Sequence, residues 1–249
     1  MTRPSGGVDV GAAIVAIAAA LVLLVQGASA QGPAWSSFVT KAVFDQTFFS
    51  GHDAFYSYEA FKAAAVSRGL SAFGSSPNLD DRKRELAAFL THVSHESGGL
   101  KEKYEQGAQG KTYCKDDTAE ARKYPCAPGK AYIGRGPLQL TWNYNYGKCG
   151  EFLGLPFLKD PGLVLQNGQT AFKTAIWFWM IQAGPLGVTA HQAILKQSFS
   201  GTIQAINGYL ECAGVGQTAL GKQQMLSRVK LYKSFCQTLN AQPGTDLEC

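Results

Sequence analysis

Glu96 and Glu105 are the acidic residues of this sequence best placed to do chemistry. Glu96 continues the apolar positions of a helix expected over residues 80–97, so its carboxyl group should meet the edge of the core. A helix C-terminus and partial burial both disfavour a charged carboxylate, as a general acid requires. The alternative is that the apolar stripe ends before Glu96, which is then solvated or salt-bridged.

Glu105 can join Glu96 only if the chain turns back on itself. A continuous helix would place the two carboxylates on opposite faces. Gly98 and Gly99 end the helix and permit such a turn. Glu102 competes for the second position, and either of these acids could instead be an ordinary charged loop residue.

Other chemistries fail on spacing. The His95-Glu96 pair lacks the second histidine of a zinc protease. His92 and His95 have no evident third ligand, so no metal is expected. Gly110-Lys111-Thr112 imitates the end of a phosphate-binding loop, but Glu105 stands where its first glycine belongs and no apolar strand precedes it. No cofactor is expected either.

The elements that must position these residues are mostly helical. Apolar periodicity predicts a helix at residues 80–97, and a strongly apolar run predicts a buried central helix at 169–182, with Trp177 and Trp179 in the core. Further helices are expected at 60–66 and 220–239. Residues 101–125 are polar and aperiodic, which indicates a loop. Residues 131–141 contain glycine, proline and short apolar alternation, which predicts a small β-hairpin.

The segment from Tyr132 to Tyr146 combines amides, a hydroxyl and aromatic rings. Amides can pair with sugar hydroxyls and N-acetyl groups, while aromatic faces can cover the apolar faces of sugar rings. The alternative is an aromatic core in which the amides cap turns.

Composition limits the class of protein. The 249 residues are 45% apolar and 16% charged, which excludes a disordered polyelectrolyte and allows one domain with a real core. The net charge of +5 is spread out, with no basic arm for nucleic acid. An apolar run over 12–25, followed by Ala28-Ser29-Ala30, predicts a signal peptide over 1–30, a secreted protein and one domain over 31–249.

Six cysteines follow the predicted signal peptide. An even number in a secreted chain indicates disulfides, but six cysteines allow 15 pairings and sequence alone does not choose among them. No C-x-x-C motif occurs, which argues against a zinc ribbon or a thioredoxin-like site.

The mature chain resembles the family 19 chitinases, on five segments in family order. These are His95 to Gly99, Tyr124 to Lys130, Gly134 to Tyr146, Phe172 to Met180, and Ile206-Asn207-Gly208 with Glu211-Cys212. The resemblance implies a mostly α, two-lobed, lysozyme-like (α+β) fold with a cleft for chitin. It corresponds to the compact, short-loop branch, without a hevein-like chitin-binding module before the domain.

The resemblance also implies roles for individual residues. Glu96 matches the general acid, Glu105 the general base, and Thr141 the hydroxyl residue that helps to hold the attacking water. Glu211 and Arg228 match the charged pair that supports the acid. The matches to residues that bind N-acetylglucosamine units are His95, Gln139, Tyr144, Asn145, Lys173 and Asn207.

The disulfides implied by the resemblance are Cys114–Cys126 beside the catalytic loop and Cys212–Cys249 at the terminus. Cys149 and Cys236 would form a third bridge or stay free, and free thiols are favoured.

The expected activity is inverting endo-hydrolysis of β-1,4-linked N-acetylglucosamine polymers. The protein is expected to be a monomer that acts outside the cell, in a vacuole or in the cell wall. No nucleic acid partner is expected, and no membrane partner after the signal peptide is cleaved. The alternatives are a catalytically silent chitin-binding or cell-wall protein and a peptidoglycan-cleaving enzyme.

Overall fold

The computed structural model describes residues 33–214 and 216–249. The predicted signal peptide and its apolar run lie outside these residues. Within the described part, no helix is both long enough and apolar enough to cross a membrane.

The described chain is mostly helical, as the sequence predicts. The expected helices at 60–66, 80–97, 169–182 and 220–239 are present with small shifts of their ends, whereas α4, α5, α7 and α8 were not predicted. In chain order the elements are η1 Ala34–Ser37, η2 Val43–Phe48, α2 Tyr58–Ala65, α3 Leu79–Glu96, α4 Ala119–Lys123, α5 Asn143–Leu153, η3 Pro161–Leu165, α6 Gly168–Ile181, α7 Ala190–Leu195, α8 Phe199–Glu211 and α9 Ala219–Thr238.

Side-chain caps fix where the long helices begin. The Asn78 carboxamide oxygen accepts hydrogen bonds from the amides of Asp80 and Asp81 at the start of α3. Asn167 caps α6 and Thr218 caps α9 in the same manner. Each cap satisfies backbone N–H groups that have no partner inside the helix, so these boundaries follow from local sequence.

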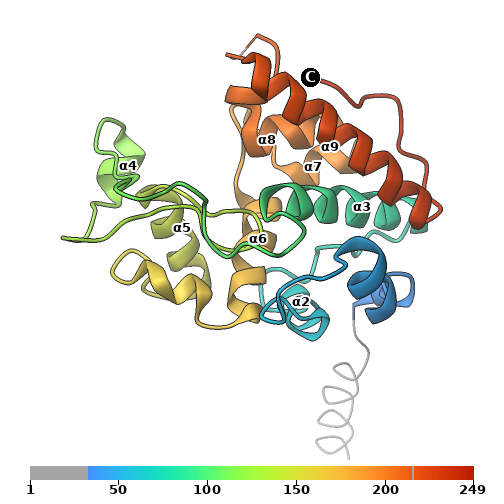
Figure 1. Ribbon diagram of the computed structural model, residues 1–249, viewed down its shortest axis with the longest axis horizontal. Helices are drawn as coiled ribbons and strands as arrows, with labels where there is room; N and C mark the ends of the chain where they lie inside the picture. Colours follow the sequence, from blue (N-terminus) through green and yellow to red (C-terminus); the bar gives the residue numbers. More distant parts are fainter. Residues whose placement is uncertain (1–32, 215) are drawn as a thin grey trace, which may run out of the picture. The chain divides into compact units, whose positions relative to one another are not determined.

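Two groups of helices provide the walls on which the site is built. Helices α3, α7, α8 and α9 pack against one another, with α9 alongside α3 (Figure 1). Helix α6 packs against α2, η3, α5 and α7, and so connects the α5 region to the rest. The core between them is aromatic: the rings of Phe61 and Phe89 stack at 5.9 Å, and Trp177 and Trp179 are buried as predicted.

The expected β-hairpin at residues 131–141 is not confirmed. Arg135 and Leu140 form only an isolated antiparallel bridge, with Tyr104 bridging Arg135 on the other side. Gln139 and Trp142 have φ angles of 49° and 75°, in the left-handed region, so extended strands cannot form around them. The result is an irregular loop that crosses the chain at residues 103–105.

The cysteine pairing agrees with the expectation. Cys114 is bonded to Cys126 and Cys212 to Cys249, while Cys149 and Cys236 are free and buried. The terminal bridge fixes the tail against the end of α8, and the Phe199 amide donates to the Asp246 carbonyl at 2.9 Å. The short helix α4 lies inside the region 101–125, which was predicted to be entirely loop.

Candidate active site

Glu96 and Glu105 line one cleft of about 710 Å³. Its walls come from the end of α3, the loop at residues 102–113, the segment at 134–145, and helices α6, α8 and α9. The lining residues are His95, Glu96, Gly98, Glu102, Tyr104, Glu105, Gln106, Tyr113, Gly134, Leu138, Gln139, Thr141, Trp142, Asn145, Phe178, Ile206, Asn207, Glu211, Gln224 and Arg228.

Glu96 ends α3 at the edge of the core. The preceding apolar positions, including Phe89 and Val93, are fully buried, while the Glu96 side chain is 20% exposed. Gly98 and Gly99 follow with φ angles of 57° and 77°, and the Gly99 amide donates to the Ser94 carbonyl at 2.8 Å. The two glycines therefore end the helix and turn the chain back, as the sequence predicts.

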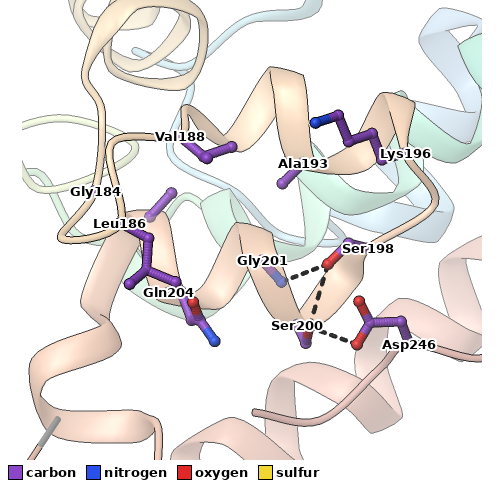
Figure 2. A pocket seen from close by; sticks show the side chains of 11 residues that line it. Gly184, Leu186, Val188, Ala193, Lys196, Ser198, Ser200, Gly201, Gln204 and Asp246 are labelled. Atoms are coloured by element: carbon purple, nitrogen blue, oxygen red, sulfur yellow. Dashed lines mark hydrogen bonds between the residues drawn. The ribbon is translucent and has the colours of Figure 1, made fainter.

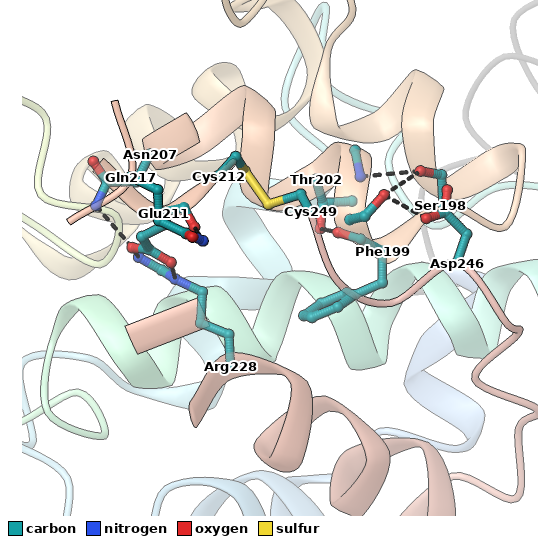
Figure 3. Close-up of a disulfide and its surroundings, with 12 residues drawn as sticks. Ser198, Phe199, Thr202, Asn207, Glu211, Cys212, Gln217, Arg228, Asp246 and Cys249 are labelled. Carbon is teal, nitrogen blue, oxygen red and sulfur yellow. Dashed lines mark hydrogen bonds and ion pairs between the residues drawn. A yellow bond between two sulfur atoms is a disulfide. The ribbon is translucent and has the colours of Figure 1, made fainter. Parts of the chain in front are cut away.

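Arg228 of α9 connects Glu96 to a second, fully buried acid, Glu211 of α8. The Arg228 Nε and Nη2 atoms each donate to a Glu211 carboxylate oxygen at 2.8 Å, and Nη2 also donates to Glu96 Oε1 (Figure 3 shows the Arg228–Glu211 pair). Asn207 Nδ2 supports Glu211 at 2.7 Å from the kink in α8. The local argument for Glu96 considered only burial and the helix end, whereas the family resemblance is what pointed to Arg228 and Glu211 as its supporting pair.

Two carboxylates thus share one guanidinium. Glu211 is fully buried and engages two donors of Arg228, whereas Glu96 is the more exposed acid of the cluster and is bonded through Nη2. The buried charge of Arg228 is therefore paired mainly with Glu211.

The two histidines of α3 add no positive charge to the cleft. Burial, followed by the nearby Arg228 guanidinium, holds the pKa of His92 well below its ordinary value and lowers that of His95. His92 Nδ1 accepts from Arg228 Nη1 at 3.0 Å, and its Nε2 lies 2.8 Å from the Thr202 hydroxyl. Among residues 33–214 and 216–249, no group of three or more His, Cys, Asp or Glu side chains could hold a metal.

Glu105 lies in a contrasting environment rich in hydrogen-bond donors. Its Oε1 accepts from the Tyr113 hydroxyl and, at 3.0 Å, from Lys111 Nζ, while Oε2 faces the Gly134 amide at 3.3 Å. Burial alone would raise the pKa of Glu105, but the bonds from Tyr113, Lys111 and Gly134 lower it overall. Glu105 is therefore a carboxylate at neutral pH.

The backbone holds Glu105 against the segment that carries the amides. The Glu105 amide donates to the Gly134 carbonyl at 2.9 Å. A Cβ atom at Gly134 would stand 2.7 Å from Gln139 Oε1 and 3.1 Å from Glu105 Cβ, so a larger residue there would require the Gln139 side chain to move and Glu105 to shift slightly. Glycine at this position allows the close approach without such shifts.

Thr141 and Asn145 line the cleft, and each carries an acceptor oxygen. The Thr141 hydroxyl donates to the Gln139 carbonyl at 2.6 Å, which leaves the lone pairs of its oxygen to accept. Asn145 Nδ2 donates to the Thr141 carbonyl at 2.9 Å, whereas its buried Oδ1 has no donor within the described part of the chain. A buried acceptor without a donor is costly, and an incoming N–H or O–H group would satisfy it.

The family model described as chitinase class I, for glycoside hydrolase family 19, matches residues 39–249. The chain belongs to glycoside hydrolase family 19. Chitinase 4 from Oryza sativa subsp. japonica is 41% identical to this chain over 195 residues, which cover 78% of this chain and 62% of the rice protein. An endochitinase from Arabidopsis thaliana is 46% identical over 195 residues, 78% of this chain and 60% of that protein.

Solved structures of family 19 share the fold. A bacterial family 19 chitinase is 38% identical, with a TM-score of 0.75 over 85% of this chain and 100% of that one. A class IV chitinase from Zea mays is 37% identical, with a TM-score of 0.72 over 86% and 99% of the two chains. This chain spans about three fifths of the length of the curated relatives described above.

Some expected site residues of this family 19 chain lie outside the cleft lining. Tyr144 is half-buried beside Trp142, with ring centroids 6.4 Å apart and planes 9° from parallel. Lys173 is half-buried on α6. Conversely, Glu102 does line the cleft together with Glu105, although only Glu105 has hydrogen-bond donors converging on its carboxylate among the described residues.

Sequence reasoning missed Lys111 and Tyr113 as parts of the site and named Trp142 only within the aromatic segment at 132–146. Tyr113 and Trp142 line the cleft with rings edge to face at 4.9 Å, and both have φ angles in the left-handed region. The available signal was weak: Lys111 was noted only for its likeness to a phosphate-binding loop, and Trp142 only as one member of an aromatic segment.

A second cavity, of about 310 Å³, lies between α7, α8 and the tail (Figure 2). Its hydroxyl groups serve the fold: Ser198 accepts from the Gly201 amide as the cap of α8, and Ser200 donates to Asp246 at 2.6 Å. The acidic pair of the cleft is absent from its lining, so the first cavity is the candidate active site.

Proposed function

We propose that this family 19 protein is a secreted endochitinase that hydrolyses β-1,4 linkages between N-acetylglucosamine units with inversion. The observation that carries the proposal is the contrast between the two glutamates of one cleft. Glu96 shares a guanidinium with a second acid, whereas Glu105 is surrounded by donors that keep it ionised. Different environments for two carboxyl groups are how a protein assigns an acid and a base.

Glu96 is the proposed general acid. In the protonated state it donates to the glycosidic oxygen as the bond to the anomeric carbon breaks, and the remaining carboxylate then pairs with Arg228. Glu211 keeps Arg228 in place through two hydrogen bonds. Arg228 and Glu211 are thus proposed to support the acid without contacting substrate.

Glu105 is the proposed general base. It takes a proton from a water molecule whose other hydrogen is directed to the Thr141 oxygen, and the water oxygen then bonds to the anomeric carbon. Because the water needs room between base and sugar, the two carboxyl groups of such a pair stand about 6.5–9.5 Å apart. A retaining pair would be closer and would use one glutamate as a nucleophile.

Chitin or its N-acetylglucosamine oligomers are the proposed substrate. His95, Gln139, Asn145 and Asn207 line the cleft and offer polar atoms to the sugar hydroxyl and N-acetyl groups. The buried Asn145 Oδ1, which has no donor in the described chain, suits an N-acetyl N–H. Tyr144 and Lys173 would contribute where a long oligomer extends past the cleft.

The remaining proposals concern the whole protein. Residues 1–30 are proposed as a signal peptide and residues 31–249 as a catalytic domain that acts as a monomer. The names of the relatives, chitinase and endochitinase, support the substrate class. Extracellular, vacuolar or cell-wall location follows only from the proposed signal peptide.

Substitution of the three cleft glutamates tests the roles. Glu96→Gln should abolish hydrolysis of a chitin hexasaccharide, because an amide cannot donate the required proton. Glu105→Gln should lose most of the activity and still bind the oligomer, and Glu102→Gln should be nearly harmless. An inactive Glu102→Gln beside an active Glu105→Gln would assign the base to Glu102 instead.

The stereochemical test is proton NMR of fresh hydrolysate before mutarotation. Inversion at a β-linkage gives the α-anomer first; an initial β-anomer would contradict the single-displacement mechanism. Bacterial cell walls assayed in parallel distinguish a peptidoglycan hydrolase, and oligomer binding without turnover by the unmodified protein would indicate a silent chitin-binding protein.

A further inference from the structure

Lys111 lies beside the proposed base, in the loop that leads to the disulfide at Cys114. Its Nζ is 3.0 Å from Glu105 Oε1 and 3.2 Å from the Tyr113 hydroxyl. The side chain is 49% exposed, and its amide is held in a turn by the Ala108 carbonyl at 3.0 Å. Lys111 therefore reaches Glu105 from the solvent side without being part of the core.

Tyr113 reaches the same oxygen from the protein side. Its hydroxyl donates to Glu105 Oε1, while its ring packs edge-on against Trp142 at 4.9 Å. The following residue, Cys114, is bonded to Cys126, which anchors the backbone at this position. Tyr113 is thus a fixed donor and Lys111 a charged, adjustable one.

The two oxygens of Glu105 consequently differ. Oε1 accepts from both Lys111 and Tyr113, whereas the one donor to Oε2 among the described residues is the Gly134 amide at 3.3 Å, beyond the ordinary range for a strong N–H···O bond. An oxygen already engaged by two donors is a poor proton acceptor. Oε2 is the atom left to receive a proton from water.

We propose that Lys111 is a positioning residue that, together with Tyr113, engages Glu105 Oε1 and so directs Oε2 toward the attacking water. This inference rests on the proposed role of Glu105 as base. In the step itself, a water O–H proton moves to Oε2, the water oxygen bonds to the anomeric carbon, the glycosidic bond breaks, and the leaving oxygen receives the proton of Glu96. Lys111 exchanges no proton.

The charge of Lys111 also keeps Glu105 ionised at acidic pH. After burial, which raises it, the donors Tyr113 and Lys111 have the largest effects on the pKa of Glu105, and both lower it. An ammonium group exposed to solvent acts in a screened environment, so its effect should weaken with salt. The other titratable side chains lining the cleft are His95, Glu96, Glu102, Tyr104, Glu211 and Arg228.

The experiment compares Lys111→Met, Lys111→Arg and a charge-matched control, Lys159→Met, in the full protein. Lys159 is exposed and outside the cleft. The readout is the acidic limb of kcat/KM against pH on a chitin hexasaccharide. Lys111→Met should move this limb to higher pH by about half a unit or more and lower kcat about tenfold, with KM within about twofold.

Two comparisons make the positioning role specific. In Lys111→Arg the acidic limb of kcat/KM should lie at the same pH as in the unmodified protein, because arginine keeps the positive charge and a hydrogen-bond donor. Raising the salt concentration should move the limb of the unmodified protein upward but leave that of Lys111→Met unchanged. Tyr113→Phe combined with Lys111→Met should cost less than the sum of the single changes, since both donors serve the same oxygen.

An unmoved acidic limb in Lys111→Met, with the same result in Lys111→Gln, would overturn the proposal. A raised KM with an unmoved limb would instead make Lys111 a substrate contact. Full activity of Glu105→Gln would refute Glu105 as base, which is a failure of the proposed function. An inactive Glu105→Gln beside an unperturbed Lys111→Met refutes only the inference about Lys111.

Discussion

Replacing Arg228 by methionine should reduce both stability and activity, and the two effects can be separated. Arg228 is 1% exposed and pairs with Glu211, which is fully buried, and with Glu96 at the cleft. In Arg228→Met, Glu211 would stay buried with Asn207 as its remaining side-chain donor in the described structure. A buried charge without its partner is strongly destabilising.

The expected loss follows from the two Arg228–Glu211 hydrogen bonds and the complete burial of the acid. Removing one partner of a buried ion pair costs about 3–5 kcal/mol of the free energy of unfolding. For a domain of this size, 1 kcal/mol changes Tm by about 2–4 °C, so Tm should fall by about 6–20 °C. The double change Arg228→Met/Glu211→Gln removes the uncompensated charge and should recover most of this loss.

Activity should not recover in the double variant. Glu96 still lacks the guanidinium that pairs with its carboxylate after proton donation, and kcat should stay at least about 100-fold below that of the unmodified protein. The assay measures Tm by calorimetry and hexasaccharide hydrolysis well below the lowest Tm. If the double variant regained stability and activity together, Arg228 would serve only to pair Glu211, and the proposed support of the acid would be wrong.

Two further outcomes concern stability. Cys249→Ser should lower the free energy of unfolding by about 3–4 kcal/mol on the loop-entropy model, because the Cys212–Cys249 disulfide closes a separation of 37 residues. Equilibrium denaturation of the oxidised protein measures this loss, and an unchanged denaturation midpoint would contradict the prediction. His92, buried with a pKa well below 6.5, stays neutral in the folded state, whereas the unfolded chain binds a proton below that pH. Stability should therefore fall with decreasing pH below about 6.5, by up to ~1.4 kcal/mol per pH unit for this group, and Tm against pH should be flatter in His92→Gln.

The local sequence pattern was sufficient to predict that Glu96 lies at the end of a helix, at the edge of the core. The apolar spacing of α3 leads directly to it, and the glycine pair after it carries the positive φ angles that end the helix. Local composition likewise predicted α9 from its apolar residues and α6 from a strongly apolar run typical of a buried helix, because these signals lie within one element. Short helices with small or polar residues, such as α5, give little periodic signal and were missed.

The irregular segment at 134–142 could not be predicted. Gln139 and Trp142 adopt left-handed backbone conformations that their side chains disfavour, and these persist only because surrounding contacts enforce them. Trp142 also precedes α5 without capping it through a side chain. Alternating apolar residues indicated a hairpin, whereas tertiary contacts with residues 103–105 produced a loop.

The partners of the two glutamates explain why the acid–base assignment needs long-range structure. Glu96 receives its guanidinium from a residue 132 positions later, already engaged by another acid, so its local helix gives no hint of the shared charge. Glu105 finds its two side-chain donors within eight positions, yet only the fold turns Lys111 and Tyr113 toward one oxygen. The proposed roles of acid and base therefore rest on how many hydrogen-bond donors surround each carboxylate, which spacing alone does not encode.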